Sequence, residues 1–172
     1  MIPLLTLLVA LLPALLLAPA CTGGSGADSA AVDPCLVDPP TAEVGTGDSS
    51  FVPLQDGDSV VIVNGPQGGQ HILGSLRTRH TTDVVAVHYT ITLQSDGTSL
   101  SDVTYRLQML PDGDCGWVYP WLYGYLGFVV GTPDTPGIED QPVIMRMDIE
   151  DQDGRQASDQ VIVTAVLQGS SG

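Results

Sequence analysis

Aromatic side chains stand at alternate positions in one short segment of this chain. The five residues are Trp117, Tyr119, Trp121, Tyr123 and Tyr125. Alternate side chains of an extended strand point to the same face, so this spacing predicts a single row of rings. Exposed rings offer flat apolar area with polar edges, which suits a polysaccharide or a protein partner. The competing interpretation is that the rings cover the core, because Pro120 and Gly124 are expected to break the strand.

The row resembles the aromatic platform of carbohydrate-binding β-sandwiches, and that resemblance implies a sugar ligand. A second candidate feature is the glycine-rich segment of residues 64–71, which ends in His71. Glycines allow backbone conformations closed to other residues and the close approach of a ligand. The segment has no Lys and no helix context, so it does not predict a phosphate-binding loop. It is interpreted either as a structural turn or as a loop in which His71 contacts a ligand.

Acidic turns form a third candidate feature, because they could supply oxygen ligands for Ca²⁺. They lie at residues 56–58, 112–114 and 148–153, and Asp151 and Asp153 are the strongest pair. None matches the twelve-residue EF-hand loop, which needs a spaced Glu. Asp and Gly are also the ordinary residues of tight turns, so the pattern is explained without a metal. No other cofactor is predicted.

No sequence pattern typical of catalysis is present, and the chain is not expected to be an enzyme. Ser95 lacks the flanking glycines of a nucleophile elbow, and no H-E-x-x-H motif occurs. Only three Glu are available for paired-carboxylate chemistry. Candidate transition-metal ligands are His71, His80 and His88 with Met109, Met145 and Met147, and two strands could bring His71 and His88 together as a copper or zinc pair. The Met residues are also explained as core residues. A hydrolase or metal-handling site assembled from distant residues therefore stays as an alternative, and no catalytic residue is predicted.

The charge balance restricts the partners. Twenty acidic and five basic residues give a formal net charge of −15, and the chain has no Lys. Nucleic acids need a basic surface, so they are excluded as partners. Electrostatic adhesion to anionic lipid is excluded for the same reason. Divalent cations and basic partners remain compatible with this charge.

Short segments of alternating hydrophobicity dominate the second half of the chain. In residues 83–94 the apolar positions are odd-numbered, from Val85 to Leu93, and the polar ones lie between them. Residues 102–110, 142–150 and 159–167 repeat the pattern, and residues 59–64 and 71–77 are further strand candidates. Turn residues separate these segments, and no segment has a helical period. The pattern predicts an all-β fold, an antiparallel Ig-like β-sandwich of about seven strands over residues 51–168. Residues 169–172 are expected to be a frayed tail.

Residues 151–159 add a resemblance to that prediction. The turn Asp-Gln-Asp-Gly-Arg is followed by Gln-Ala-Ser-Asp and a Val-rich segment. This order resembles the closing hairpin of Ig-like and PKD-type bacterial surface modules. The resemblance implies a sandwich and no particular function, since such modules carry many functions.

The first 21 residues suggest where the protein resides. Residues 1–20 are apolar and uncharged, end in Ala18-Pro19-Ala20 and precede Cys21. This order resembles the signal of a bacterial lipoprotein, which is removed before the new N-terminal Cys is lipidated. The alternatives are ordinary cleavage after Ala20 and a transmembrane helix, against which Pro13 argues. Residues 21–50 are rich in Gly, Ser, Ala, Asp and Pro and predict a disordered tether.

The lipoprotein resemblance also implies a disulfide. Lipidation of Cys21 leaves Cys35 and Cys115, which an oxidising compartment would join. Ordinary cleavage would instead leave an odd thiol. Together these features predict a non-catalytic module of the bacterial cell envelope, on the periplasmic or outer surface. A lipid would anchor it to a membrane, and it would act in binding or as a structural part. The alternative is a carbohydrate-binding module that uses the aromatic row.

Overall fold

A computed structural model describes residues 33–65, 69–127 and 137–168 of the chain. The chain divides into two units, residues 1–31 and 32–172, and every described residue belongs to the second. Cys21, the predicted signal and the predicted C-terminal tail lie outside the described residues. No helix in the described ranges is long and apolar enough to cross a bilayer.

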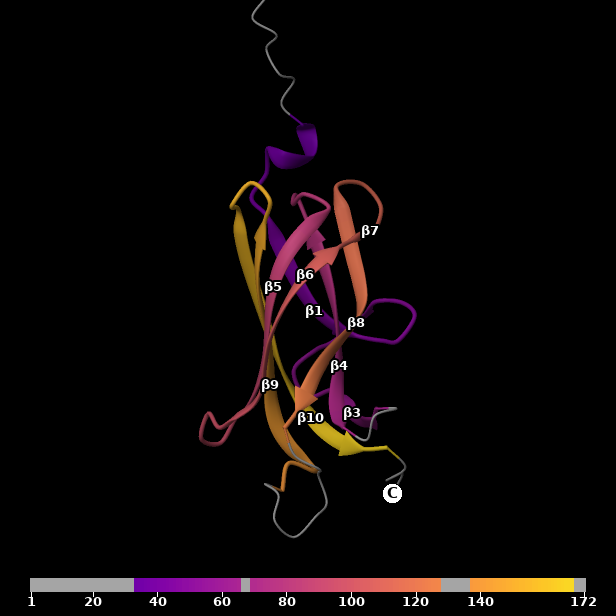
Figure 1. The fold of residues 1–172 in the computed structure, drawn as a ribbon, viewed down its shortest axis with the longest axis vertical. Helices are drawn as coiled ribbons and strands as arrows, with labels where there is room; N and C mark the ends of the chain where they lie inside the picture. Colours follow the sequence, from indigo (N-terminus) through magenta and orange to yellow (C-terminus); the bar gives the residue numbers. More distant parts are fainter. Residues whose placement is uncertain (1–32, 66–68, 128–136, 169–172) are drawn as a thin grey trace, which may run out of the picture. The chain divides into compact units, whose positions relative to one another are not determined.

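One short 3₁₀ turn and ten strands make up the described part of the second unit (Figure 1). Their bounds are η1 Pro34–Leu36, β1 Thr41–Thr46, β2 Val52–Pro53, β3 Ser59–Asn64, β4 Gln70–Arg79, β5 Val84–Leu93, β6 Ser99–Gln108, β7 Leu110–Pro111, β8 Gly116–Leu126, β9 Gln141–Asp151 and β10 Gln156–Leu167. The prediction of an all-β, sandwich-like fold is confirmed. The count of about seven strands was too low, because β2 and β7 are two-residue strands that no periodicity reveals and β1 lies outside the predicted domain.

The strands form one curled sheet in the order β2-β1-β4-β3-β10-β9-β5-β6, and β8 pairs with the free edge of β4. All pairs are antiparallel except β3 with β10, which run parallel. The curl brings the two halves of the sheet face to face. Gly74 of β4 packs against Met147 of β9 and Tyr89 of β5, and Gly124 of β8 packs against Ile91 of β5. The core lies between the β1–β4–β8 layer and the β5–β6–β9–β10 layer.

Side chains enter the core as the alternation predicts. On β5, Val85, Val87, Tyr89 and Ile91 are fully buried, whereas His88 faces outward. On β9 the buried set is Val143, Met145, Met147 and Ile149, and on β10 it includes Val161, Val163 and Ala165. Each strand therefore presents one face to the core and the other to solvent. This arrangement makes the outer faces of the two layers available for function.

The predicted tether of residues 21–50 is too long, because its second half belongs to the folded domain. Residues 41–46 form β1, which pairs with β4, and Val44 is buried in the core. The backbone N–H of Val44 donates to Asp159 of β10 at 2.8 Å. The strand consists of small and polar residues apart from Val44, so its composition resembles that of a tether.

Strong contacts fix η1 at one end of the domain (Figure 1). A disulfide joins Cys35 to Cys115, which follows the pairing expected from the cysteine count. The Arg155 guanidinium donates to the carbonyl oxygens of Leu36 and His80, and its Nε donates to Asp151. We call the Cys35–Cys115 disulfide together with His80, Asp151 and Arg155 the clamp. The disulfide and the Arg155 hydrogen bond therefore hold η1 on the folded domain.

Candidate functional site

The predicted aromatic row lies on β8, but a bulge divides it. Residue pairs between β4 and β8 are Thr78 with Trp117 and Leu76 with Tyr119 before the bulge, and Gly74 with Leu122 after it. Two residues of β8, Pro120 and Trp121, thus stand opposite Ser75 alone. Because one extra residue reverses the alternation, the odd-numbered rings change face at this point. The prediction of five rings on one face was therefore wrong, and so was the expectation that Pro120 breaks the strand.

Trp117 and Tyr119, the first two rings, face the core. Both pair with residues of β4 that are buried, Thr78 and Leu76, and both pack against the hydrophobic core. The indole N–H of Trp117 donates to the Thr81 carbonyl at 2.9 Å, so its polar edge is satisfied inside the protein. These two rings are structural, as the competing interpretation of the aromatic segment predicted.

Trp121, Tyr123 and Tyr125 face outward, and we call these three residues the ring row. Their exposed fractions are 45%, 47% and 55%. Leu122, Gly124 and Leu126 between and beyond them point into the core and hold the strand in place. Tyr123 and Tyr125 are two residues apart, which corresponds to about 6.8 Å along a strand, whereas Trp121 lies in the bulge that precedes them. The row is therefore a set of exposed rings on a strand whose other face is buried.

Gly69 and His71 pack against two rings of the ring row. A Cβ at Gly69 would lie 2.5 Å from a ring carbon of Tyr125, so this ring lies directly on the glycine backbone. His71 lies in β4 opposite Tyr125, and its ring meets that of Tyr123 edge to face at 5.0 Å and 82°. A Cβ at Gly65 would in turn clash with His71. Gly65, Gly69 and His71 thus lie beside Tyr123 and Tyr125, and the two glycines give room to the rings of His71 and Tyr125. Residues 66–68 of the glycine-rich segment lie outside the described residues.

Trp121 adopts an unusual backbone conformation. Its φ is 71°, in the left-handed region that favours glycine. For a bulky side chain this conformation costs about 1–2 kcal/mol relative to the ordinary strand conformation. The conformation coincides with the bulge, and the tryptophan side chain is 45% exposed. Strain of this kind at an exposed aromatic residue points to a role outside the fold.

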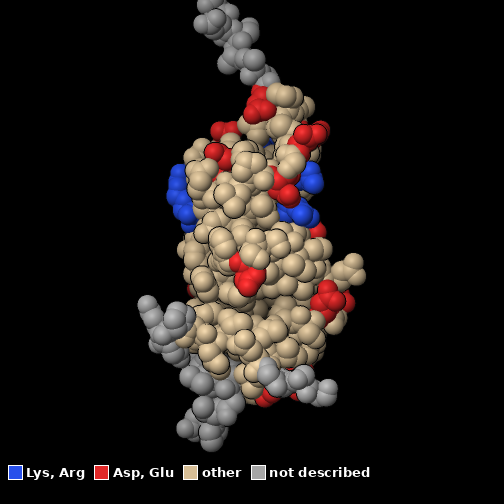
Figure 2. All heavy atoms as spheres, turned by 90° about the vertical axis from the view of Figure 1, so that its right-hand side faces the viewer, with Lys and Arg blue, Asp and Glu red and all other residues tan. Residues whose placement is uncertain are grey.

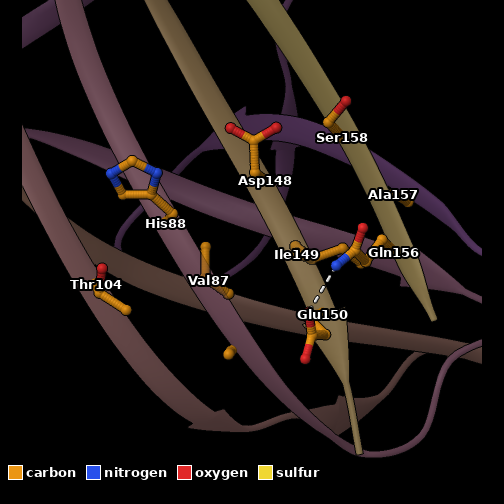
Figure 3. Close-up of a pocket in the computed structure, with 10 residues that line it drawn as sticks. Val87, His88, Thr104, Asp148, Ile149, Glu150, Gln156, Ala157 and Ser158 are labelled. Carbon is orange, nitrogen blue, oxygen red and sulfur yellow. Dashed lines mark hydrogen bonds between the residues drawn. The ribbon is translucent and has the colours of Figure 1, made fainter. Parts of the chain in front are cut away.

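A shallow groove of about 440 Å³ lies on the outer face of the other layer (Figure 3). Its floor includes Ala86, whose small side chain leaves the space, and its walls include His88, Asp148, Glu150 and Ser158. Thr104, His88, Asp148 and Ser158 form one cross-strand line, because they are register partners on β6, β5, β9 and β10. Sequence parity indicated that His88 points outward, but it could not show which residues of other strands stand beside it.

The groove's polar side chains are largely occupied by one another. His88 Nε2 contacts Asp102 Oδ1 at 2.8 Å, Arg146 Nε donates to Asp148 at 2.9 Å, and Gln156 donates to Glu150 at 2.7 Å. Ser158 lies two strands from His88, about 10 Å at the usual strand spacing. That separation is too large for a nucleophile and its base, which must be within hydrogen-bond reach. The groove therefore provides no nucleophile–base pair.

Asp151, the first predicted calcium ligand, is buried and accepts four N–H donors. Its Oδ1 accepts the backbone N–H groups of Asp153 and Arg155, and its Oδ2 accepts that of Thr82 and the Nε of Arg155. Burial raises the pKa of Asp151, but the four donors outweigh it and hold the pKa below its ordinary value. A cation at this turn would compete with a guanidinium that is already bound. Asp153, the second candidate, is exposed.

Within the described ranges, no three His, Cys, Asp or Glu side chains are grouped as a metal site. His71 and His88 lie on different layers, so the structure does not bring together the pair that sequence suggested for copper or zinc. Sequence reasoning named His80 only as a candidate metal ligand and did not predict that His80 and Arg155 meet in the clamp. Arg155 was noted only as part of a turn, and no local pattern links it to Leu36, which precedes it by 119 residues.

Comparisons with known proteins do not assign the chain to a family. No family model matches it, and no curated protein matches it. One solved structure that matches is the CooA pilin subunit from enterotoxigenic Escherichia coli, at 13% sequence identity and a TM-score of 0.35. The match covers 73% of this chain and 99% of the pilin chain. A likeness of that size assigns neither a function nor a partner, and none is taken from it.

Proposed function

We propose that this protein is a non-catalytic binding module of the bacterial cell envelope, anchored by a lipid on Cys21, and that the ring row is its contact surface. The observation that carries the proposal is the row itself. Trp121, Tyr123 and Tyr125 are exposed side by side on a strand whose opposite face is buried. Large rings with few rotatable bonds lose little entropy on binding, so a fixed row of them is an efficient contact surface.

Cysteine usage supports the proposed export and anchoring. Cys35 and Cys115 are joined to each other, and Cys21 is the third cysteine of the sequence. Disulfides persist in oxidising compartments outside the cytosol. The sequence that precedes Cys21 has the order of a lipoprotein signal. A tether from Cys21 to the clamp would hold the ring row away from the membrane.

Mass spectrometry of the mature protein tests the anchor. The full chain is expressed in a bacterium and recovered from the envelope fraction, with Cys21→Ser as the matched control. The expected result is an N-terminus at residue 21 that carries a lipid mass, and loss of that mass in the control. An intact chain that begins at Met1 in the cytosolic fraction, with Cys35 and Cys115 reduced, would contradict export and anchoring together.

Binding measurements test the contact surface. Variants Tyr123→Ala and Tyr125→Ala remove one ring each, whereas Leu110→Ala removes an exposed side chain of β7, outside the ring row. Capture of envelope components by the purified domain is expected to fall in the ring variants and to persist in the Leu110 control. Equal capture by all variants would exclude the ring row as the contact surface.

A further inference from the structure

We propose that the ligand of the ring row is a neutral glycan chain that lies along β8. This inference rests on the proposed function, because it takes the ring row as the contact surface and names the chemical class that it recognises. The first supporting observation is the linear arrangement of the rings. Tyr123 and Tyr125 occupy alternate positions of the strand and Trp121 precedes them in the bulge, so three rings follow one another along β8, as suits a polymer of similar sugar units.

The rings are held in place before any ligand binds. Tyr125 lies on the backbone of Gly69, and Tyr123 meets the edge of His71. His71 Nδ1 makes no hydrogen bond in the described part of the chain, so packing against Tyr123 and Gly65 positions its ring. On the other side, the Tyr105 hydroxyl donates to the backbone carbonyl of Tyr123 at 2.7 Å and ties β8 to β6. A preorganised row loses little freedom when a flexible chain binds to it.

The polar edges of the ring row are not bonded to the described residues. The hydroxyls of Tyr123 and Tyr125 and the indole N–H of Trp121 make no hydrogen bond to residues 33–65, 69–127 or 137–168. By contrast, the Trp117 indole and the Tyr105 hydroxyl, which lie outside the row, both donate to carbonyl oxygens. A sugar offers C–H groups to the face of a ring and hydroxyls to its edge. The free edges therefore fit a polyhydroxylated ligand better than a purely apolar one.

Charge indicates that the glycan is neutral. The ring row and its β4 neighbours, His71 and Leu73, include no Arg, Asp or Glu. Arg77 and Arg79 share this outer face of β4, but both lie on the other side of the bulge from Tyr123 and Tyr125. The Arg77 guanidinium is held by Glu43 and Asp112 and covered by Phe51, whereas Arg79 is exposed and donates to the Asp114 carbonyl oxygen at 3.3 Å. Neither Arg is a register partner of the ring row, and the net charge of −15 repels polyanions.

Figure 2 shows one side of the domain, where Arg and several acidic side chains gather toward the end that carries η1, and further acidic side chains lie in the middle and at the opposite end. Protein interfaces bury about 800 Å² per partner and are enriched in Arg as well as in aromatic residues. Membrane-surface contacts use clusters of basic residues. The ring row is one strand wide and has no basic residue, so the glycan is the ligand that these observations favour.

The test is a binding panel with the purified full-length mature protein. Probes are three neutral polysaccharides (hydroxyethylcellulose, xyloglucan and galactomannan), two anionic ones (polygalacturonate and hyaluronan), and phosphatidylethanolamine–phosphatidylglycerol vesicles. We expect affinity for at least one neutral glycan and none for the anionic ones. Loss of one stacked ring in Tyr123→Ala is expected to weaken that affinity about tenfold. Tyr123→Phe keeps the ring and loses the hydroxyl, so its affinity is expected to fall less.

Trp121→Gly separates binding from folding. The glycine suits the left-handed backbone of the bulge, so the variant is expected to keep its melting temperature while its glycan affinity falls. Leu110→Ala serves as the control with unchanged affinity. Binding that is confined to anionic glycans or vesicles and is lost in the ring variants would overturn the glycan class while leaving the ring row as contact surface. Absence of any neutral-glycan binding overturns the inference, and binding that no ring variant reduces overturns the proposed function as well.

Discussion

The polar groups of the clamp and those of the ring row differ in their hydrogen-bond partners. In the clamp, the Asp151 carboxylate accepts hydrogen bonds from four N–H groups. The Arg155 side chain donates to two carbonyl oxygens and to that carboxylate. In the ring row, two phenol hydroxyls and one indole N–H make no hydrogen bond to the described residues. Asp151 ends β9 and the ring row lies on β8, and both strands belong to the same curled sheet. The difference teaches that polar groups bonded within the chain serve stability, while polar groups that are not bonded within the described part of the chain are available for a ligand.

Each region can be damaged separately. If the comparison is right, changes in the clamp lower the free energy of unfolding and leave the ring row able to bind once the protein is folded. Changes in the ring row lower the affinity for a ligand and leave the free energy of unfolding nearly unchanged.

Removal of the disulfide is expected to have the largest effect on stability. Cys35 and Cys115 are 80 residues apart, and a loop of that length corresponds to about 4 kcal/mol of unfolding free energy in the chain-entropy model. The double variant Cys35→Ser/Cys115→Ser should therefore lose about that amount in urea denaturation. Glycan affinity measured well below its melting temperature should match that of the parent. An unchanged midpoint would show that η1 contributes nothing to the fold.

Asp151→Asn is the next largest change. The amide keeps the size of the carboxylate, but its NH₂ group would face the Thr82 N–H and the Arg155 Nε, which are both donors. Loss of a buried ion pair and its charged hydrogen bonds should cost about 3 kcal/mol. The matched control is Asp153→Asn in the same turn, because the Asp153 carboxylate accepts no hydrogen bond from the described residues and should change stability by less than about 0.5 kcal/mol. Equal effects of the two substitutions would contradict the role given to Asp151.

The same carboxylate predicts a dependence of stability on pH. Four donors outweigh burial and hold the pKa of Asp151 below its ordinary value of about 3.9. The native state thus favours the charged form, so the stabilisation is complete above about pH 4 and is lost as pH falls through the folded pKa. The backbone N–H of Thr98 also lowers the pKa of Asp96. Asp96 is present in both proteins, so its contribution cancels in the stability difference between them. The stability difference between the parent and Asp151→Asn should therefore shrink in acid, and a difference that is constant from pH 7 to pH 3 would argue against this linkage.

The sequence predicted the fold class well and the extent of the domain poorly, for a physical reason. Period-2 alternation on β5, β9 and β10 reports burial of one face, and that is a local property of each strand. β1 contributes one large apolar residue, Val44, so its composition resembles that of a tether even though it pairs with β4. What holds it in the sheet is contact with distant residues, such as the bond from Val44 to Asp159. Such long-range pairing has no local signal.

The ring row shows a similar limit. The alternation of five rings was visible in the sequence, but the face of each ring depends on the bulge at Pro120 and Trp121. Pro120 was noticed as a residue that disturbs a strand, and the structure shows that the disturbance is a change of register rather than a break. A proline within an alternating aromatic segment therefore indicates that the row can change face, which divides structural rings from exposed ones. Apart from Cys35 and Cys115, no local sequence pattern indicated the clamp.

Substitutions in the ring row should have small effects on stability. Tyr125→Ala and Tyr123→Ala remove exposed rings and are expected to stay within about 1 kcal/mol of the parent. For Trp121→Gly, relief of about 1–2 kcal/mol of backbone strain offsets the added freedom of the unfolded glycine, about 0.5–1 kcal/mol. Chemical denaturation of the three variants measures this directly. Tyr119→Ala is the informative contrast, since that ring packs on the core and should cost about 3 kcal/mol.

Calcium should have the smallest effect of all. A ligand that binds only the folded state adds about 2.7 kcal/mol when its concentration is one hundred times its dissociation constant, so a real site would raise the melting temperature. At the Asp151 turn the carboxylate oxygens already accept N–H donors, and the guanidinium of Arg155 occupies the position that a cation would need. We therefore expect the same melting temperature in millimolar calcium and in chelator. If calcium raised the melting temperature and Asp153→Asn abolished that increase, the metal interpretation of this turn would be restored. It would also remove the contrast between the clamp and the ring row, because the clamp would then bind a ligand of its own.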